Sequence, residues 1–260
     1  MQFVEIEKRN NLAPLFESCE DATILSAISG KNGSAYADNE DEPKVAMMVI
    51  GDYVFITGSD KDPEIKKALD ILDKIYKNNG FNIRTLNKEL DPVIEKHYRK
   101  RIYKYYRFAT LRTFKYMDFK KLEEAVIKKS KDYTFSLVNK ELYQKCKETE
   151  WMRDFVIGFD TYEEWEKDGL GVLILKDGEP VSGATSYSAY PGGIEIEIIT
   201  REDMRNQGLA FAGAAALLLE CKKRGLVASW DAAHEDSLRL AERLGYRLLY
   251  RYEILGIKDK

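Results

Sequence analysis

The 260-residue chain has little of several features that mark particular classes of protein. It holds only two histidines and three cysteines, Cys19, Cys146 and Cys221, which lie far apart without any CxxC spacing. We therefore expect neither a disulfide framework nor a metal site. The net charge of −3 provides no field that would draw the whole molecule to nucleic acid or to an anionic membrane.

Long hydrophobic runs are also missing. The longest uncharged apolar stretch, residues 210–219, is too short to span a bilayer. The opening residues, MQFVEIEKRN, have no basic segment followed by an apolar core, so we expect no signal peptide and a soluble, cytoplasmic protein. What the chain does have, 44% hydrophobic and 33% charged residues with 16 Tyr and 11 Phe, is typical of a globular protein. Its oligomeric state stays open.

Residues 1–119 have the pattern of an α/β domain. The stretch 12–30 (LAPLFESCEDATILSAISG) predicts a helix. Three predicted strands follow, at residues 33–39, 45–50 and 53–58. Gly51-Asp52 between the last two is typical of a hairpin turn, and residues 63–80 predict a second helix.

Residues 96–121 are basic and aromatic. They hold ten Lys or Arg against one acid, Asp118, interleaved with Tyr and Phe. One interpretation is a nucleic-acid surface, in which cations contact phosphates and rings stack on bases. The other is a helix end and a long strand joining two halves, with solvated charges on one face. We favour the second and expect no nucleic-acid partner, because the whole chain is acidic and has no RNA-binding signature.

The second half, residues 120–260, alternates predicted strands and helices. After helical and strand-like segments up to residue 169, with Asp160 as an expected N-cap, residues 171–190 predict a hairpin with an Asp-Gly turn. The remaining elements are predicted in the order strand 192–202, helix 209–225, strand 226–233, helix 236–245 and strand 246–255. This order predicts an α/β or α+β sheet covered by helices.

The string Arg205-Asn206-Gln207-Gly208-Leu209-Ala210 lies between a predicted strand and a predicted helix. A glycine there lets the backbone approach a ligand, and the free N–H groups of the first helical turn, at the positive end of the helix dipole, hold an anion such as a pyrophosphate. Ala210, Gly213 and Ala214 keep the helix narrow enough for a bulky cofactor. Alone, the string is common, and a structural glycine in a turn is the simpler interpretation.

In its context the string resembles the core of the GNAT N-acetyltransferase superfamily. The run has a strand, an R/Q-x-x-G-x-G/A loop, a helix, a strand and then N-x-x-S/A-x-x-L-x-x-x-L-G-F/Y. SWDAA followed by SLRLAERLGY is most similar to the zwittermicin A resistance-like branch. The resemblance is specific over residues 170–250 and looser over 120–170. It implies a GNAT acyltransferase domain at 120–260, with a mixed, mainly antiparallel sheet flanked by helices. Residues 1–119 are then either an α/β domain of unknown role or a degenerate GNAT-like half.

The resemblance also implies where acetyl-CoA binds. Backbone N–H groups from Arg205 to Ala210 would bind its pyrophosphate, and the strand edge at Ile198, Ile199 and Thr200 would pair with the pantetheine arm. The adjacent apolar residues Ile198 and Ile199 break strict alternation, which indicates either a bulge that turns an N–H toward the thioester carbonyl or a fully buried strand end.

Amine acylation requires a base, and two carboxylates are candidates. Glu195 and Glu197 alternate with Ile194, Ile196 and Ile198, so both lie on one face of a strand beside the expected cofactor. Two nearby carboxylates raise each other's proton affinity, which moves one toward a useful pKa. The other interpretation is an ordinary solvated face. If either is the base, its Gln variant should lose turnover but keep acetyl-CoA binding.

Two departures from the family pattern leave roles open. The family often carries Asn at the position of His234, where it touches the cofactor arm, and Ser237 occupies the S/A position of the same motif. His234 could bind the cofactor, act as a base or be exposed. Many members have a general-acid Tyr at the position that Ala241 occupies here. Tyr187, Tyr190 and Tyr246 are then the remaining candidates for the proton donor to the CoA thiolate.

The sequence thus predicts an acetyl-CoA-dependent N-acyltransferase that acts on a primary amine. The resemblance implies that the amine belongs to a small polar molecule such as an antibiotic. Aromatic and acidic side chains lie where the family builds its acceptor pocket, at Trp151, Tyr162, Trp165, Glu150, Asp160, Glu163 and Glu164. The alternatives are a catalytically inactive acyl-CoA sensor and, less favoured, a nucleic-acid-binding protein.

Overall fold

The computed structural model describes residues 3–19 and 21–259 and divides into two compact units. Unit 1 comprises Met1–Arg107 and Arg251–Lys260, and unit 2 comprises Phe108–Tyr250. A single boundary at residue 119 therefore does not separate them, because the second part of β13 (Leu248–Ile257) returns to pair with β5 (Phe81–Thr85) of unit 1.

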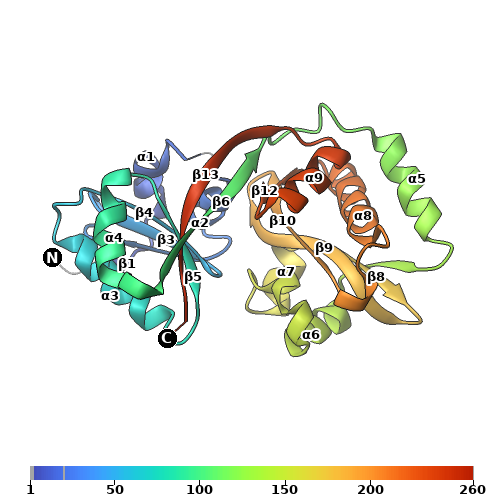
Figure 1. Cartoon of the computed structure of the whole chain (residues 1–260), viewed down its shortest axis with the longest axis horizontal. Helices are drawn as coiled ribbons and strands as arrows, with labels where there is room; N and C mark the ends of the chain where they lie inside the picture. Colours follow the sequence, from blue (N-terminus) through green and yellow to red (C-terminus); the bar gives the residue numbers. More distant parts are fainter. Residues whose placement is uncertain (1–2, 20, 260) are drawn as a thin grey trace. The chain divides into compact units, whose positions relative to one another are not determined.

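Unit 1 is built on a twisted sheet (Figure 1). Its first strands are β1 (Val4–Glu5), β2 (Ser34–Ala37), β3 (Ala46–Ile50) and β4 (Tyr53–Thr57), followed in the sheet by β5, β13 and β6 (Ile102–Thr110). β2, β3 and β4 are antiparallel, and β4 and β5 are parallel. The predicted hairpin is confirmed, since Ile50 pairs with Tyr53 across Gly51-Asp52.

Helices cover both faces of this sheet. α3 (Glu64–Ile75) and α4 (Asp91–Tyr98) pack on the face that carries Met47, Val54 and Ile83. All residues of β3 and β4 are buried, as expected for strands covered on both sides. The short helical turns are η1 (Arg9–Leu12), α1 (Ala13–Phe16), η2 (Lys88–Leu90) and η3 (Arg99–Arg101).

The continuous helix expected over residues 12–30 is wrong. α1 ends at Phe16, and a separate helix, α2 (Ala22–Ile28), begins after Asp21. The Asp21 carboxylate accepts the Thr23 N–H at 3.0 Å, so the chain starts a new helix there. An Asp side chain stabilises such a start because it satisfies an N–H that has no partner within the helix.

Unit 2 has a five-stranded sheet in the order β11-β10-β9-β8-β7. Its strands are β7 (Thr134–Leu137), β8 (Gly171–Lys176), β9 (Glu179–Tyr190), β10 (Gly193–Thr200) and β11 (Val227–Ser229). β10 and β11 are parallel, and the other pairs are antiparallel. The predicted mixed, mainly antiparallel sheet flanked by helices is confirmed.

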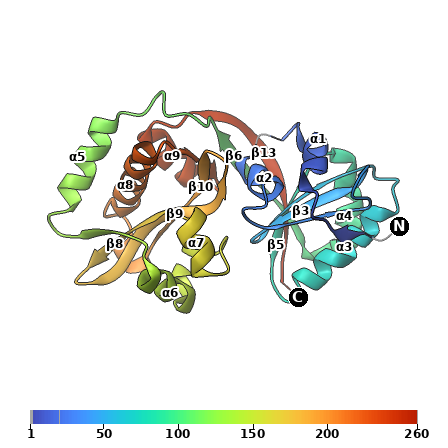
Figure 2. The same ribbon diagram turned by 180° about the vertical axis from the view of Figure 1, so that it is seen from behind.

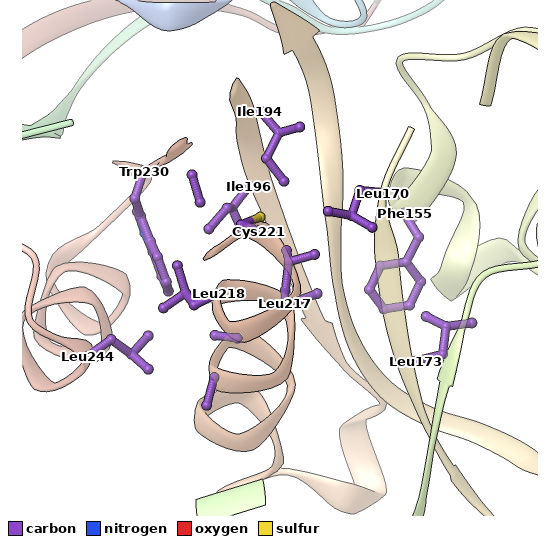
Figure 3. Packing of buried hydrophobic residues seen from close by; sticks show 14 of the residues in the cluster. Phe155, Leu170, Leu173, Ile194, Ile196, Leu217, Leu218, Cys221, Trp230 and Leu244 are labelled. Carbon is purple, nitrogen blue, oxygen red and sulfur yellow. The ribbon is translucent and has the colours of Figure 1, made fainter. Parts of the chain in front are cut away.

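Helices flank this sheet as well (Figure 2). They are α5 (Phe119–Lys129), α6 (Lys140–Glu148), η4 (Glu150–Val156), α7 (Tyr162–Asp168), η5 (Glu202–Met204), α8 (Leu209–Arg224) and α9 (Glu235–Leu244). Leu217 and Leu218 of α8 lie in one core with Ile194 and Ile196 of β10, to which Phe155 of η4 also belongs (Figure 3). Within the described residues, no helix is both long and apolar enough to cross a membrane.

Two local predictions in unit 2 are wrong. The N-cap of α7 is Thr161, whose hydroxyl accepts the Glu164 N–H, and not Asp160. The strand expected at 226–233 is interrupted at Trp230, so that β11 pairs with β10 whereas β12 (Asp231–Ala232) pairs with β6. Pairing with two different strands requires this break, and a local pattern does not contain it.

Candidate functional site

The neighbouring parallel strands β10 and β11 separate partway along their length. Gly193, Ile194 and Glu195 pair with Val227, Ala228 and Ser229, and the pairing stops there. On its other side β10 stays paired with β9 from Gly193 to Thr200. Among the described residues, β10 beyond Glu195 therefore has one edge without a ladder partner.

The backbone of β10 presents alternate residues to this open edge. The Ile199 carbonyl accepts the Ser182 hydroxyl of β9 at 3.0 Å, so Ile199 faces β9. The neighbouring Ile198 N–H instead donates to its own strand's Glu197 carboxylate at 3.2 Å. Because N–H groups alternate between the two edges of a strand, Ile198 presents its N–H to the open edge.

Of the two interpretations of Ile198-Ile199, a bulge or a fully buried strand end, the structure bears out neither. The register of β10 with β9 runs unbroken from Ile196 to Thr200 and shifts between Glu195 and Ile196. There Ser188 and Ser186 pair with consecutive residues of β10, so the extra residue is Tyr187 on β9. Two apolar neighbours in sequence reflect a partly buried strand end here, because Ile198 and Ile199 are both half-buried and pack against the core.

The loop before α8 has left-handed residues and leaves the helix start accessible. Gly208 is the N-cap residue with φ +73° and ψ +15°, a left-handed conformation that costs glycine little, and Asn206 also has positive φ. Gly208 has no side chain that could cap α8, and in the described structure the first turn of α8 carries no acid. A Cβ at Gly208 would meet only Lys129 Cε, at 3.9 Å, so the backbone borders open space. This fits a diphosphate group held by the loop from Arg205 to Ala210.

The small residues of α8 have a different purpose from the one expected. Gly213 and Ala214 are buried against the sheet, and a Cβ at Gly213 would lie 3.4 Å from the Gly183 carbonyl carbon on β9. They therefore bring the helix close to the strand and do not line the cofactor space. Ala210, which is half-buried in the first turn, remains near the loop.

The two candidate bases lie in different surroundings. Glu195 is only 6% exposed, and its Oε1 accepts the Asp231 N–H at 2.6 Å, just after β11 leaves β10. Glu197 is half-buried and lies opposite Thr185 of β9, whose hydroxyl donates to the Phe155 carbonyl of η4 at 2.7 Å. Directly opposed residues share a face, so Glu197 lies on the face covered by η4. Glu195 thus forms a hydrogen bond with the backbone of Asp231, whereas Glu197 lies at the open edge of β10.

His234 and Ser237 both stabilise the start of α9. His234 is exposed and is the N-cap residue; its Nδ1 accepts the Ser237 N–H at 3.2 Å. The Ser237 hydroxyl accepts the Trp230 Nε1–H at 3.1 Å. An Asn at position 234 could cap the helix in the same way. In this structure the imidazole is turned toward its own helix.

The three tyrosines considered as proton donors are not equivalent. The Tyr246 hydroxyl is buried and donates to the Ala228 carbonyl at 2.9 Å, and burial holds its pKa well above 10. Burial also raises the pKa of Tyr190 to about 12, and its hydroxyl bonds to Ser229. Tyr187, at the bulge, is half-buried. Tyr246 and Tyr190 therefore serve the core.

Trp165 does not line an acceptor pocket. It is 2% exposed, packs edge-on against Phe159 and donates its Nε1–H to the Val138 carbonyl at 3.3 Å. Trp151 and Tyr162 are half-buried, whereas the acids are exposed, at Glu150, Asp160, Glu163 and Glu164. Only Trp151 and Tyr162 of the three aromatic residues thus retain surface for a ligand.

Several cations of the basic and aromatic segment 96–121 have partners within the fold. Its strand β6 carries Lys104, which forms ion pairs with Glu95 and Glu253, and Arg101 lies near Asp73. Arg107 lies over the Tyr53 ring. Arg101 and Lys104 thus pair with carboxylates, and Arg107 packs on a ring, within the same unit of the fold. Across the described residues, no group of three or more His, Cys, Asp or Glu side chains could hold a metal ion.

Comparison with known proteins gives a consistent result. Residues 13–255 match the family model described as GNAT acetyltransferase. A crystal structure of a GCN5-related N-acetyltransferase-like protein from Streptococcus suis 89/1591 is 33% identical, with a TM-score of 0.86 over 96% of this chain and 98% of that one. A GCN5-related N-acetyltransferase from Kribbella flavida has 18% identity and a TM-score of 0.56 over 92% and 95% of the two chains, which shows the fold alone.

Among curated proteins, the "Uncharacterized N-acetyltransferase YdfB" of Bacillus subtilis (strain 168) is 30% identical over 98 residues. This match covers 37% of the present chain and 38% of the length of that protein.

Proposed function

The chain belongs to the GNAT acetyltransferase family and is a GNAT-type N-acetyltransferase, and from this premise we propose that unit 2 transfers an acetyl group from acetyl-CoA to the primary amine of a small polar molecule. The observation that carries this proposal is the open edge of β10 beyond Glu195, on the strand that leads through η5 to an uncapped α8. An extended pantetheine arm can pair with such an edge, while the loop at Gly208 holds the diphosphate.

The residues at the open edge suggest how they assist the reaction. When bound, acetyl-CoA supplies a thioester whose acetyl group forms the amide while the sulfur leaves as thiolate. We assign proton removal from the amine to Glu197 and hydrogen bonding to the thioester carbonyl to the Ile198 N–H. In this structure the Ile198 N–H donates to the Glu197 carboxylate at 3.2 Å. When the thioester carbonyl accepts this N–H instead, the carboxylate loses a hydrogen bond and can accept the proton of the amine.

Glu195 has a positioning role in this proposal. Its carboxylate accepts the Asp231 N–H at the point where β11 ends, which supports the separation of the two strands. The half-buried Trp151 and Tyr162 and the exposed acids favour a cationic amine. The resemblance to zwittermicin A resistance-like proteins favours a small polar molecule over a protein as the acceptor.

Ligand binding and turnover test the proposal in order. Acetyl-CoA at about a hundredfold excess over its dissociation constant should stabilise the fold by about 2–3 kcal/mol, whereas NAD should not. A panel of polyamines, aminoglycosides and amino sugars is then screened for release of the CoA thiol. An unchanged melting temperature at millimolar acetyl-CoA would refute the proposal. Binding without turnover on any amine would favour the inactive acyl-CoA sensor.

For unit 1 we propose a second GNAT-like half that has lost its cofactor site. The support is its element order: antiparallel β2, β3 and β4, then α3, the parallel strand β5 and α4. The same order recurs in β8, β9, β10, α8, β11 and α9. Calorimetric titration should therefore give one acetyl-CoA per chain, and a stoichiometry of two would contradict this assignment.

A further inference from the structure

The last turn of α5 brings a lysine to the start of α8. The two helices pack side by side in opposite directions, with Lys222 near the end of α8 over the Phe119 ring that begins α5. At the other end, Lys129 Cε is the atom that a Cβ on Gly208 would meet, at 3.9 Å. Lys129 thus borders the same open space as the uncapped helix start.

A tyrosine that follows α5 connects this lysine to the loop. Lys129 Nζ lies 5.9 Å from the centre of the Tyr133 ring. The Tyr133 hydroxyl donates to Gln207 Oε1 at 3.0 Å. Lys129, Tyr133 and the loop before α8 therefore form one connected group. Neither Lys129 nor Tyr133 belongs to the R/Q-x-x-G-x-G/A string.

Lys129 lies in the last turn of α5, where the dipole of its own helix favours a cation, and also beside the start of α8, where the dipole of that helix disfavours one. Cations stabilise the C-terminus of a helix and are repelled by the positive end of its dipole. At the far end of α8, Lys223 and Arg224 follow this rule and also pair with Glu220. Lys129 stands beside the start of α8, and within the described residues it forms no ion pair with a carboxylate. An anion bound between Lys129 and the first-turn N–H groups of α8 would attract both and would offset the repulsion between them.

We propose that Lys129 is a second anchor for the diphosphate of the acyl-CoA substrate, supplied by α5 from outside the loop of Arg205 to Ala210. The inference rests on the proposed function of unit 2. A lysine ammonium is a point charge that binds phosphate without a fixed orientation. The flexible side chain can therefore follow the diphosphate as it settles onto the loop.

The test compares CoA binding by calorimetry for wild type, Lys129→Gln, Lys129→Arg and Lys128→Gln. Lys128 is the adjacent, exposed lysine of the same helical turn and serves as the matched control. Lys129→Gln should weaken binding about tenfold and reduce its salt dependence. Lys129→Arg should retain most of the affinity, and Lys128→Gln should match wild type.

Dephospho-CoA, which keeps the diphosphate but lacks the 3′-phosphate, identifies the anion. The same loss with this ligand supports the diphosphate, and disappearance of the loss overturns that assignment. Equal affinity of Lys129→Gln and wild type refutes the inference alone. If the wild type binds neither CoA nor acetyl-CoA, the proposed function fails and the inference fails with it. Melting temperatures of the ligand-free variants exclude a folding defect.

Discussion

β4 with β5 in unit 1 and β10 with β11 in unit 2 are both parallel strand pairs joined by one α-helix. Among the described residues, the second pair leaves an open edge and the first does not. In unit 1 four of the five residues of β4, Tyr53 to Ile56, pair with β5. In unit 2 three of the eight residues of β10 pair with β11 before the strands separate. The same topology thus gives a strand edge that is paired along most of its length in unit 1 and a strand edge that is mostly unpaired in unit 2.

The helices that follow these strands differ in the same direction. At the start of α3, the Asp62 carboxylate accepts the Glu64 N–H at 2.9 Å, and Glu64 places a second acid in the first turn. α8 has neither a capping side chain nor an acid in that position. Acids at the start of α3 disfavour an anion there, whereas the first turn of α8 carries none. The two units therefore differ both in strand pairing and in the charge at the helix start.

The largest effect is expected for a substitution of Gly208 and concerns the affinity for acetyl-CoA. Gly208→Val should abolish measurable acetyl-CoA binding, because the new side chain fills the open space beside the first-turn N–H groups. The positive φ also strains valine, at a cost of about 1–3 kcal/mol. Gly225→Val at the other end of α8 is the matched control, since it has φ +70° and open surroundings. Both variants should lose stability in urea unfolding, and only Gly208→Val should lose binding in calorimetry. Unchanged affinity would place the phosphates elsewhere.

The next effect separates the two carboxylates of β10. Glu197→Gln should reduce turnover by about 10²- to 10⁴-fold with acetyl-CoA binding kept, because it removes the base without changing size. The deficit should shrink as pH rises, since more of the amine is then already deprotonated. Glu195→Gln should cost less turnover, because an amide oxygen can still accept the Asp231 N–H. The test compares steady-state rates of both variants with the best amine acceptor. Equal losses of turnover would contradict the assignment of the base to Glu197 and of a positioning role to Glu195.

Thiol chemistry should also differ between the units. Burial raises the pKa of Cys146 and of Cys221 in unit 2 to about 12, because the thiolate is poorly solvated there. At pH 8 the thiolate fraction of each is then about 10⁻⁴, which makes both unreactive in the folded state. Cys19 in unit 1 is half-buried. Ellman titration should therefore detect one thiol in the native protein and three in denaturant. Rapid reaction of three thiols without denaturant would show that the core of unit 2 opens readily.

The smallest effect concerns the start of α3. Asp62→Ala should destabilise the protein by about 0.5–2 kcal/mol, because the Glu64 N–H loses its acceptor. Asp60→Ala, two residues earlier, should change the free energy of unfolding by less, as measured by urea denaturation. Neither variant should create a second acetyl-CoA site, because β4 stays paired with β5. A stoichiometry of two in the Asp62 variant would show that the Asp62 carboxylate alone keeps acetyl-CoA out of unit 1.

The sequence alone determined those features whose physical cause lies within a few residues. The start and end of α8 follow from Gly208 and Gly225, which both adopt left-handed backbone conformations. The β8–β9 hairpin turns at Asp177-Gly178, both with positive φ. The order of strands and helices in unit 2 follows from local periodicity in the same way, and so does the position of the loop from Arg205 to Ala210.

Only the tertiary structure decided which residues meet. Residues 226–233 have one strand-like pattern, yet Trp230 divides them because β10 and β6 each take a part. Trp165 resembles a pocket residue in sequence and is buried. Lys129 precedes Gly208 by a long stretch of chain and still borders it, because α5 packs along α8. Backbone preferences act over one or two turns, whereas burial and pairing depend on partners that a local pattern does not contain.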